Sequence, residues 1–199
     1  MGRRPGLRID CDRLPIASQG ARPAPLPSSV DPLPSVDLIV AETPQQIEGA
    51  RALFREYAEQ LGVDLCFQGF EAELTNLPGD YGAPRGTLLL ALVEGELAGC
   101  CALRPIDDVD YSNAAEMKRL YVRKAFRGFG LGRQLAEAIL EAAIQLGYVS
   151  VLLDTLDDME SARALYADLG FVEIPPYYHN PIAGAHYLKV DLRDCANHY

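Results

Sequence analysis

The chain has 199 residues, of which 49% are hydrophobic and 23% charged, and its formal net charge at pH 7 is -10. This length predicts one domain with a sizeable core, and the acidic balance argues against nucleic acid or an anionic membrane as a partner. The longest apolar run, Leu88–Val93, is far shorter than the roughly 18 residues of a membrane span, and the N-terminal arginines are not followed by the apolar segment of a secretory signal.

The five cysteines are at positions 11, 66, 100, 101 and 195, an odd number without metal-ligand spacing. Free thiols in a reducing compartment fit this pattern best, so we expect a cytoplasmic protein. Cys100 and Cys101 are adjacent in a predicted strand, so they should face opposite sides of a sheet, with at least one of them filling the core. The three histidines are not clustered either, and we expect no metal site.

Residues 1–35 differ from the rest of the chain. They hold seven of the 14 prolines and few apolar residues, which predicts an extended or disordered tail. The alternative is an arm that packs on the domain or on a second subunit, and the sequence leaves a homodimer open. We therefore divide the chain into a proline-rich segment, residues 1–35, and a single domain, residues 36–199.

The first half of this domain predicts a strand, two helices and a β-hairpin. Thr43 and Gln46 form a capping box with Pro44 at the first helical position, and Gly62 ends that helix. The loop Asp64–Gly69 either contacts a substrate or simply joins the two helices. The predicted elements are a strand at Val36–Val40, a helix from Thr43 to Leu61, a helix at Phe70–Leu77, and hairpin strands at Thr87–Val93 and Leu97–Leu103.

The second half predicts a right-handed βαβ unit, then a helix and two more strands. The whole order, β-α-α-β-β-β-α-β-α-β-β, predicts a mixed α/β layer. The predicted elements are a strand at Ala115–Val122, an amphipathic helix at Gly130–Leu146, a buried strand at Val149–Asp154, a helix from Asp157 or Asp158 to Gly170, and strands at Phe171–Ile174 and Ala185–Leu192.

The stretch from Glu116 to Ala136 combines basic residues with glycine. Six Lys or Arg residues and no acid lie between Met117 and Ala136. Three glycines, Gly128, Gly130 and Gly132, lie where the predicted strand leads into the helix, and they allow the backbone to approach a ligand closely. The start of the helix adds its positive dipole end. Together these features predict an anion site.

Three phosphate-binding patterns compete for this stretch. A P-loop is excluded because no Gly-Lys-Ser/Thr follows the glycines. A Rossmann turn requires G-x-G-x-x-G, whereas the spacing here is G-x-G-x-G; Asp154 lies where a ribose-binding acid would stand, but only one βαβ crossover is predicted. The third pattern, Arg127-x-x-Gly130-x-Gly132, is the R/Q-x-x-G-x-G/A signature of the GNAT acyltransferase superfamily, and it follows a strand and opens a helix.

A later segment adds to this resemblance. The run Ala162-x-x-Leu165-Tyr166-x-x-Leu169-Gly170-Phe171 resembles the A-x-x-L-Y-x-x-x-G-F segment of the superfamily. The resemblance covers residues 36–192 and implies the GNAT fold: a mixed, mostly antiparallel sheet of six to seven strands with helices on both faces. The sequences LDTL-x-x-M and F-x-E-I-P-P-Y-Y resemble a branch of small stand-alone bacterial members. Relatives often carry Asn where this chain has Met159.

The resemblance implies an N-acetyltransferase that moves an acetyl group from acetyl-CoA to a primary amine of a small molecule or amino acid, by direct attack in a ternary complex. Tyr166 then acts as general acid toward the thiolate and Glu116 as general base; the structural alternatives are a core tyrosine and a solvated strand-edge carboxylate. A backbone amide near Leu120 or Tyr121 would polarise the carbonyl. The implied coenzyme contacts are Leu120, Tyr121 and Val122 along the pantetheine arm, and Arg127, Gly128, Phe129, Gly130, Leu131, Gly132 and Arg133 around the pyrophosphate.

Other functions stay open at this point. The acceptor could be an amino group of a protein or peptide, and an acyl-CoA-binding module without catalysis would need the same coenzyme site. Tyr177, Tyr178 and His179 either line the acceptor pocket or pack as a tyrosine-rich loop on the edge of the sheet. The sequence does not identify the acceptor.

Overall fold

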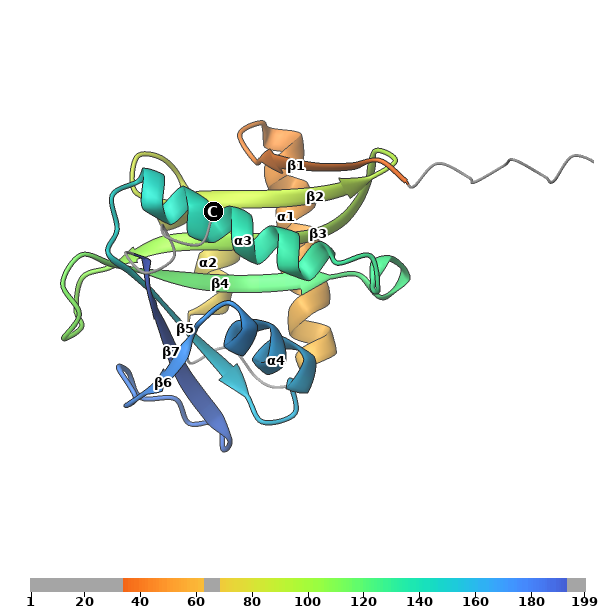
Figure 1. Ribbon diagram of the computed structural model, residues 1–199. Coiled ribbons are helices and arrows are strands. Elements are labelled where there is room, and N and C mark those ends of the chain that lie inside the picture. Colours follow the sequence, from red (N-terminus) through yellow and green to blue (C-terminus); the bar gives the residue numbers. More distant parts are fainter. Residues whose placement is uncertain (1–33, 63–68, 193–199) are drawn as a thin grey trace, which may run out of the picture. The chain divides into compact units, whose positions relative to one another are not determined.

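The computed structural model describes residues 34–62 and 69–192, which form one seven-stranded sheet covered by helices (Figure 1). The strand order is β1-β2-β3-β4-β5-β7-β6, and every neighbouring pair is antiparallel except β4 and β5, which are parallel. The strands are β1 (Val36–Val40), β2 (Thr87–Val93), β3 (Glu96–Ile106), β4 (Ala114–Val122), β5 (Ser150–Leu156), β6 (Val172–Ile174) and β7 (Ala185–Asp191), and the α-helices are α1 (Pro44–Leu61), α2 (Phe70–Asn76), α3 (Leu131–Gln145) and α4 (Glu160–Asp168).

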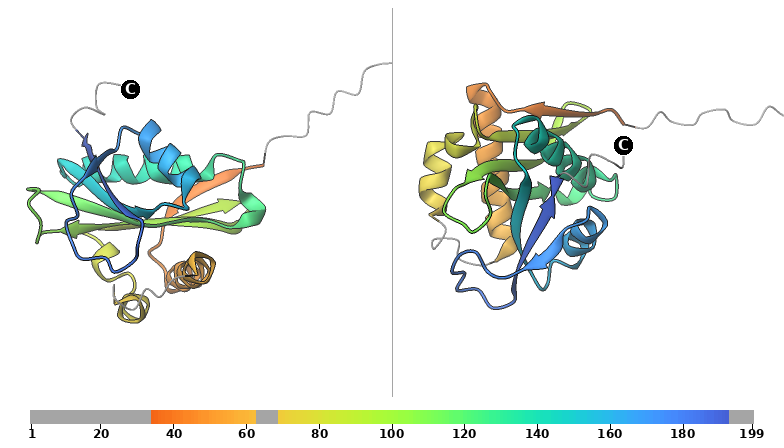
Figure 2. Two further views of the ribbon diagram at one scale, coloured as in Figure 1. Left: turned by 90° about the horizontal axis from the view of Figure 1, so that it is seen from below. Right: turned by 60° about the vertical axis from the view of Figure 1, so that its left-hand side comes forward.

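The helices cover both faces of the sheet. Figure 2 shows α1 and α2 on one face and α3 and α4 on the other. Strand β2 is apolar on both sides, so Leu88 and Leu90 pack in the cluster under α1 and α2, whereas Leu89 and Ala91 pack under α3. The two neighbouring cysteines follow the same alternation: Cys100 and Cys101 are free, buried, and belong to opposite clusters.

The predicted fold class is confirmed, as is the order of its elements within the described residues. The capping box forms, since the Gln46 amide donates to Thr43 Oγ1 over 3.3 Å and the Thr43 amide donates to Gln46 Oε1 over 2.9 Å. Several predicted ends were wrong. Strand β5 ends at Leu156 rather than Asp154. Strand β3 continues past Leu103 because Arg104 pairs with Glu116 across the sheet. Helix α4 starts at Glu160 rather than Asp157 or Asp158.

Some predictions concern residues that the structure does not describe. The proline-rich segment is described only from residue 34, and the loop between α1 and α2 only at Gly69. Among the residues that are described, no helix is both long and apolar enough to span a bilayer.

Candidate active site

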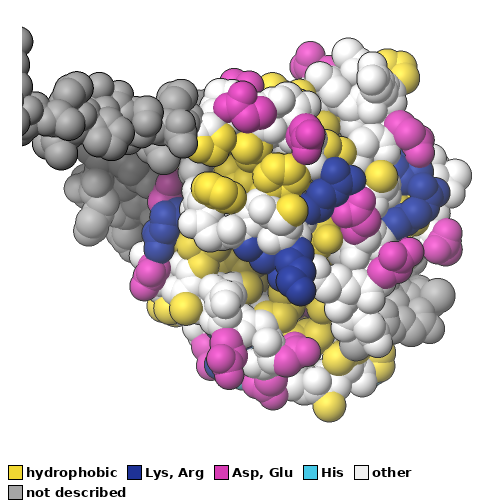
Figure 3. Space-filling model, turned by 90° about the vertical axis from the view of Figure 1, so that its right-hand side faces the viewer, with side chains coloured by type: hydrophobic (Ala, Val, Ile, Leu, Met, Phe, Trp, Pro, Cys, Tyr) yellow, Lys and Arg dark blue, Asp and Glu magenta, His cyan; other side chains and the backbone are white. Residues whose placement is uncertain are grey.

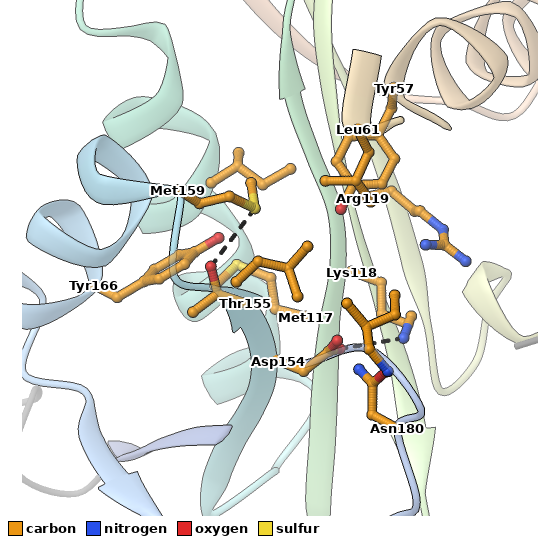
Figure 4. A pocket seen from close by; sticks show the side chains of 13 residues that line it. Tyr57, Leu61, Met117, Lys118, Arg119, Asp154, Thr155, Met159, Tyr166 and Asn180 are labelled. Carbon is orange, nitrogen blue, oxygen red and sulfur yellow. Dashed lines mark hydrogen bonds and ion pairs between the residues drawn. The ribbon is translucent and has the colours of Figure 1, made fainter. Parts of the chain in front are cut away.

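A cavity opens in the sheet where strands β4 and β5 separate. These parallel strands pair only through Ala114–Glu116 and Ser150–Leu152. Beyond those residues both strands continue without pairing to each other, so β4 presents an edge that is free on this side. Figure 4 shows the side chains around the gap. The cavity is lined by Tyr57, Leu61, Met117, Lys118, Arg119, Leu120, Asp154, Thr155, Leu156, Met159, Tyr166, Asn180 and Ile182.

Strand β4 carries a β-bulge beside this cavity. Its pairing with β3 passes from Cys100–Tyr121 to Ala102–Lys118, so two residues of β4, Arg119 and Leu120, lie opposite one residue of β3. Arg119 has φ of 58°, a left-handed conformation that costs a non-glycine residue about 1 kcal/mol or more. The bulge takes the backbone of Leu120 out of the ladder at the cavity wall.

The Arg119 side chain is held by a buried ion pair with α2. Its Nε and one terminal nitrogen donate to the two carboxylate oxygens of Glu73, from α2, over 2.9 and 2.6 Å. The guanidinium also lies over the Phe70 and Tyr57 rings, 5.3 and 5.8 Å from their centroids, and Tyr81 donates to Glu73 over 2.8 Å. This network supports the unusual backbone of the bulge.

Tyr166 lies on the opposite wall of the cavity, on α4. Its side chain is buried against Phe171, yet it is one of the residues that line the cavity (Figure 4). Burial raises the pKa of Tyr166 well above its ordinary value, so the hydroxyl stays protonated at neutral pH. Met159, at the position where relatives often carry Asn, stands at the start of the same helix. Its sulfur accepts a hydrogen bond from Thr155 Oγ1 over 3.7 Å.

Glu116 is not the solvated strand-edge carboxylate that was the structural alternative; its side chain is 1% exposed. Arg104 Nε donates to one of its oxygens over 2.8 Å, and the Tyr177 hydroxyl donates to the other over 2.9 Å. Lys118 Nζ lies 3.6 Å away. Burial by itself would raise the pKa of Glu116, but Lys118 and Arg104 outweigh it and hold that pKa below its ordinary value. Glu116 is therefore ionised and already paired.

The glycine turn stands at the start of α3, past the end of β4. Gly128 and Gly130 have φ of 90° and 74°, conformations that favour glycine. No side chain caps the first amides of α3, and a Cβ on Gly132 would meet nothing closer than Leu165 Cδ2 at 4.0 Å. Open backbone and uncapped helical N–H groups are what a phosphate group requires, so these residues fit the coenzyme pyrophosphate.

The six basic residues of the Glu116–Ala136 stretch do not act as one patch. Lys118 and Arg119 are buried, and Arg123 donates to both oxygens of Glu56. Arg127 donates to the Val122 carbonyl and to Gln60, which ties the glycine turn to the end of β4 and to α1. Figure 3 shows the face of the molecule that contains the start of α3. Lys and Arg side chains gather near the centre of this face.

The tyrosine-rich loop between β6 and β7 packs on the same part of the sheet. The rings of Tyr177, Tyr178 and Tyr187 pack against one another at centroid distances of 5.3 to 5.4 Å. The two loop tyrosines do not line the cavity, whereas Asn180 and Ile182 do. Sequence reasoning did not place these two residues, or Tyr57, Lys118 and Asp154, at the cavity. Asp154 belongs to the LDTL-x-x-M run, but that run does not show where its side chain lies.

The uncapped start of α3 offers an anion site, and the unpaired edge of β4 offers a place for an extended chain, so the arrangement fits an acyltransferase that uses coenzyme A. The chain belongs to the GNAT family: the family model described as "Acetyltransferase (GNAT) family" matches residues 50–171. The Rossmann interpretation is thereby excluded, and the chain is an acyltransferase of the N-acetyltransferase type.

Two relatives illustrate the range of sequence similarity. A Schizosaccharomyces pombe protein named "uncharacterized N-acetyltransferase" is 38% identical over 159 residues, which cover 79% of this chain and 96% of the relative. Human N-acetylaspartate synthetase is 28% identical over 123 residues, which cover 61% of this chain and 37% of the human protein.

Solved structures share the fold. A GNAT-family acetyltransferase from Staphylococcus aureus superposes with a TM-score of 0.64 at 19% identity, covering 79% of this chain and 99% of that protein. A Salmonella typhimurium protein solved with its cofactor acetyl-CoA has a TM-score of 0.58 at 16% identity, covering 79% and 94%. These neighbours show the fold that this chain shares with them. The described residues contain no group of three or more His, Cys, Asp or Glu that could hold a metal ion.

Proposed function

We propose that this protein transfers the acetyl group of acetyl-CoA to a primary amine of a small molecule or amino acid, by direct attack in a ternary complex. The observation that carries this proposal is the cavity between β4 and β5, where a protonated tyrosine, Tyr166, lines the same space as the free strand edge at Leu120. The names of the N-acetylaspartate synthetases support an amino acid as acceptor.

Acetyl-CoA supplies the activated acyl group as a thioester, and the chain supplies its binding surfaces. The backbone around Gly128, Gly130 and Gly132, with Leu131 and the side chains of Arg127, Phe129 and Arg133, holds the pyrophosphate. The edge of β4 at Leu120–Val122 holds the pantetheine arm in the manner of an added strand. The amide of Leu120, which the bulge removes from the β3 ladder, donates to the carbonyl oxygen as negative charge develops there.

Tyr166 donates its proton to the sulfur that leaves. Its raised pKa keeps it protonated until negative charge appears beside it. Glu116 stays our prediction from the sequence for the general base. In that role it would have to accept a proton while it contacts Arg104, Lys118 and Tyr177. We keep residues 36–199 as one catalytic domain.

An amine panel tests this function. The protein is mixed with acetyl-CoA, a thiol-detecting reagent, and one amine at a time: aspartate, glycine, ethanolamine, spermidine or a short peptide. Release of coenzyme A with a small amine or amino acid supports the proposal. Release with the peptide alone favours a protein acetyltransferase. Thermal stabilisation by coenzyme A without release for any amine would favour a binding module without catalysis.

Replacing Tyr166 with phenylalanine is expected to lower kcat about 100-fold, because general acid catalysis contributes about 10²–10⁴. The ring and its packing on Phe171 are kept, so coenzyme A affinity measured by calorimetry should change less than threefold.

The matched control for this variant is Tyr148→Phe. Tyr148 is also buried, but its hydroxyl donates to the Arg85 carbonyl over 2.6 Å, and Tyr148 does not line the cavity. This control should lose about 1 kcal/mol of stability and keep its turnover. Full turnover in the Tyr166 variant would remove the tyrosine from the acid role.

A further inference from the structure

Four charged side chains form a row across strands β3, β4 and β5, on one face of the sheet. Arg104 contacts Glu116 Oε2 over 2.7 Å, and Lys118 Nζ lies 3.6 Å from both Glu116 Oε1 and Asp154 Oδ1. The register explains the row. Arg104 and Glu116 are partners in the β3–β4 ladder, and Glu116 is the partner of Leu152 in β5. Lys118 and Asp154 each lie two residues further along, so they share that face.

The charges in this row alternate, and the row ends at the cavity. Each inner group is neutralised by its neighbours, because Glu116 lies between Arg104 and Lys118, and Lys118 lies between Glu116 and Asp154. Asp154 has one cationic neighbour in the row and lines the cavity with a side chain that is 15% exposed, against 1% for Glu116. It is the one acidic side chain among the described residues that line the cavity. A cationic amine that enters would therefore meet Asp154.

The groups that face Asp154 come from several elements. Lys118 and Glu116 lie on β4. The Tyr178 hydroxyl hydrogen-bonds to Asp154 from the loop before β7, and burial, together with Asp154, raises the pKa of Tyr178. The other tyrosines whose pKa rises partly through the charge of Asp154 are Tyr57 on α1, Tyr166 on α4, Tyr177 in the loop and Tyr187 on β7. Lys118 is the one cation that ion-pairs with Asp154 among the described residues.

We propose that Asp154, in place of the Glu116 that the sequence predicts as general base, receives the ammonium group of the acceptor and takes the proton whose loss makes the amine a nucleophile. Glu116 is then a positioning residue that acts through Lys118. This inference rests on the proposed function.

The proton balance is closed. The ammonium loses one proton to the Asp154 carboxylate, the neutral nitrogen forms the amide bond as the carbon–sulfur bond breaks, and the sulfur leaves with the electron pair of that bond and a proton from Tyr166. The attacking nitrogen releases its second proton, which returns to Tyr166 through solvent. Asp154 then releases its proton to water.

The test compares Asp154→Asn with Glu116→Gln, using two acceptor probes. One probe is the amine of the panel with the highest turnover, which is protonated at pH 7. The other is methoxyamine, a primary amine that is already neutral at pH 7. Asp154→Asn is expected to lower kcat/KM for the protonated amine at least 100-fold and for methoxyamine less than tenfold, and raising the pH should restore activity toward the first probe. Glu116→Gln is expected to lower both by similar factors, without rescue at high pH.

Coenzyme A binding, measured by calorimetry, provides the readout that does not depend on turnover, and Asp154→Asn should leave it unchanged within threefold. If Asp154→Asn folds poorly, Asp154→Glu is measured instead. This variant keeps the carboxylate and should retain the pH profile of the wild type. The inference would be overturned if Glu116→Gln lost activity only toward the protonated amine and regained it at high pH, while Asp154→Asn was unaffected. That result would assign the base to Glu116 and leave the proposed function standing. Wild-type protein that binds coenzyme A and acetylates no amine would overturn both.

Discussion

Replacing Glu73 with alanine will lower the free energy of unfolding by about 3–5 kcal/mol, because it leaves the Arg119 guanidinium buried without its counter-charge. The Arg119 and Glu73 side chains are 3% and 11% exposed. Arg119 also holds a left-handed backbone at the bulge, with φ of 58°, so the loss of its anchor should disturb the cavity wall at Leu120 as well.

Urea unfolding followed by circular dichroism measures this effect, and in a domain of this size the melting temperature should fall about 6–20 °C. Glu71→Ala is the matched control: Glu71 lies on the same helix with an exposed side chain, and its loss should cost less than about 1 kcal/mol. Glu73→Gln keeps the shape and removes the charge, so it should fall between the two. An unfolding free energy of Glu73→Ala within about 1 kcal/mol of wild type would show that the pair does not hold the bulge.

Replacing Gly132 with aspartate will weaken coenzyme A binding at least about 100-fold while keeping the fold. A carboxylate about 4 Å from a phosphate costs up to about 4 kcal/mol at an effective dielectric constant of 20, and each 1.4 kcal/mol is about a tenfold change in affinity. The protein itself tolerates the side chain, since a Cβ there meets nothing closer than 4.0 Å. An acidic residue in the first turn of α3 also interacts favourably with the positive end of the helix dipole.

Two further substitutions at the same position separate charge from size. Gly132→Asn has nearly the same volume without the charge and should lose less than tenfold in affinity. Gly132→Ala matches the G/A position of the family signature, so it should bind normally and gain about 0.5–1 kcal/mol of stability. The difference between aspartate and asparagine should shrink as salt is added. Equal affinities for these two variants would mean that the pyrophosphate does not lie at the start of α3.

Most of the fold could be predicted from the sequence because its signals are local. The capping box at Thr43, the glycine that ends α1, and the continuous apolar run of β2 each act within a few residues of chain, and the structure contains all three. The strand boundary at Leu103 was predicted wrongly for the complementary reason. Whether β3 continues through Arg104 depends on Glu116, a partner on another strand.

The candidate site likewise has residues that local sequence signals predict and residues that depend on distant parts of the chain. The glycine turn and Tyr166 belong to motifs with fixed spacing, so both could be found without a structure. Asp154 was considered only as a ribose-binding acid of a rejected template, and Lys118 only as one charge in a basic run. Lys118 has no local pattern, and the LDTL run that contains Asp154 does not show where its side chain lies. Their positions matter only where two strands, whose paired residues are 36 apart in the chain, come together and then separate.

The sequence by itself determined the order of the elements and the place of the glycine turn, because glycine conformation, helix capping and apolar periodicity are properties of neighbouring residues. Its motifs resembled the GNAT superfamily, to which the family model assigns the chain. Only the tertiary structure decided which charges meet. The pairing of Glu73 with Arg119, and the row from Arg104 to Asp154, follow from strand register and from the point at which β4 and β5 separate. Ion pairing depends on distance in space, and the folded chain sets that distance.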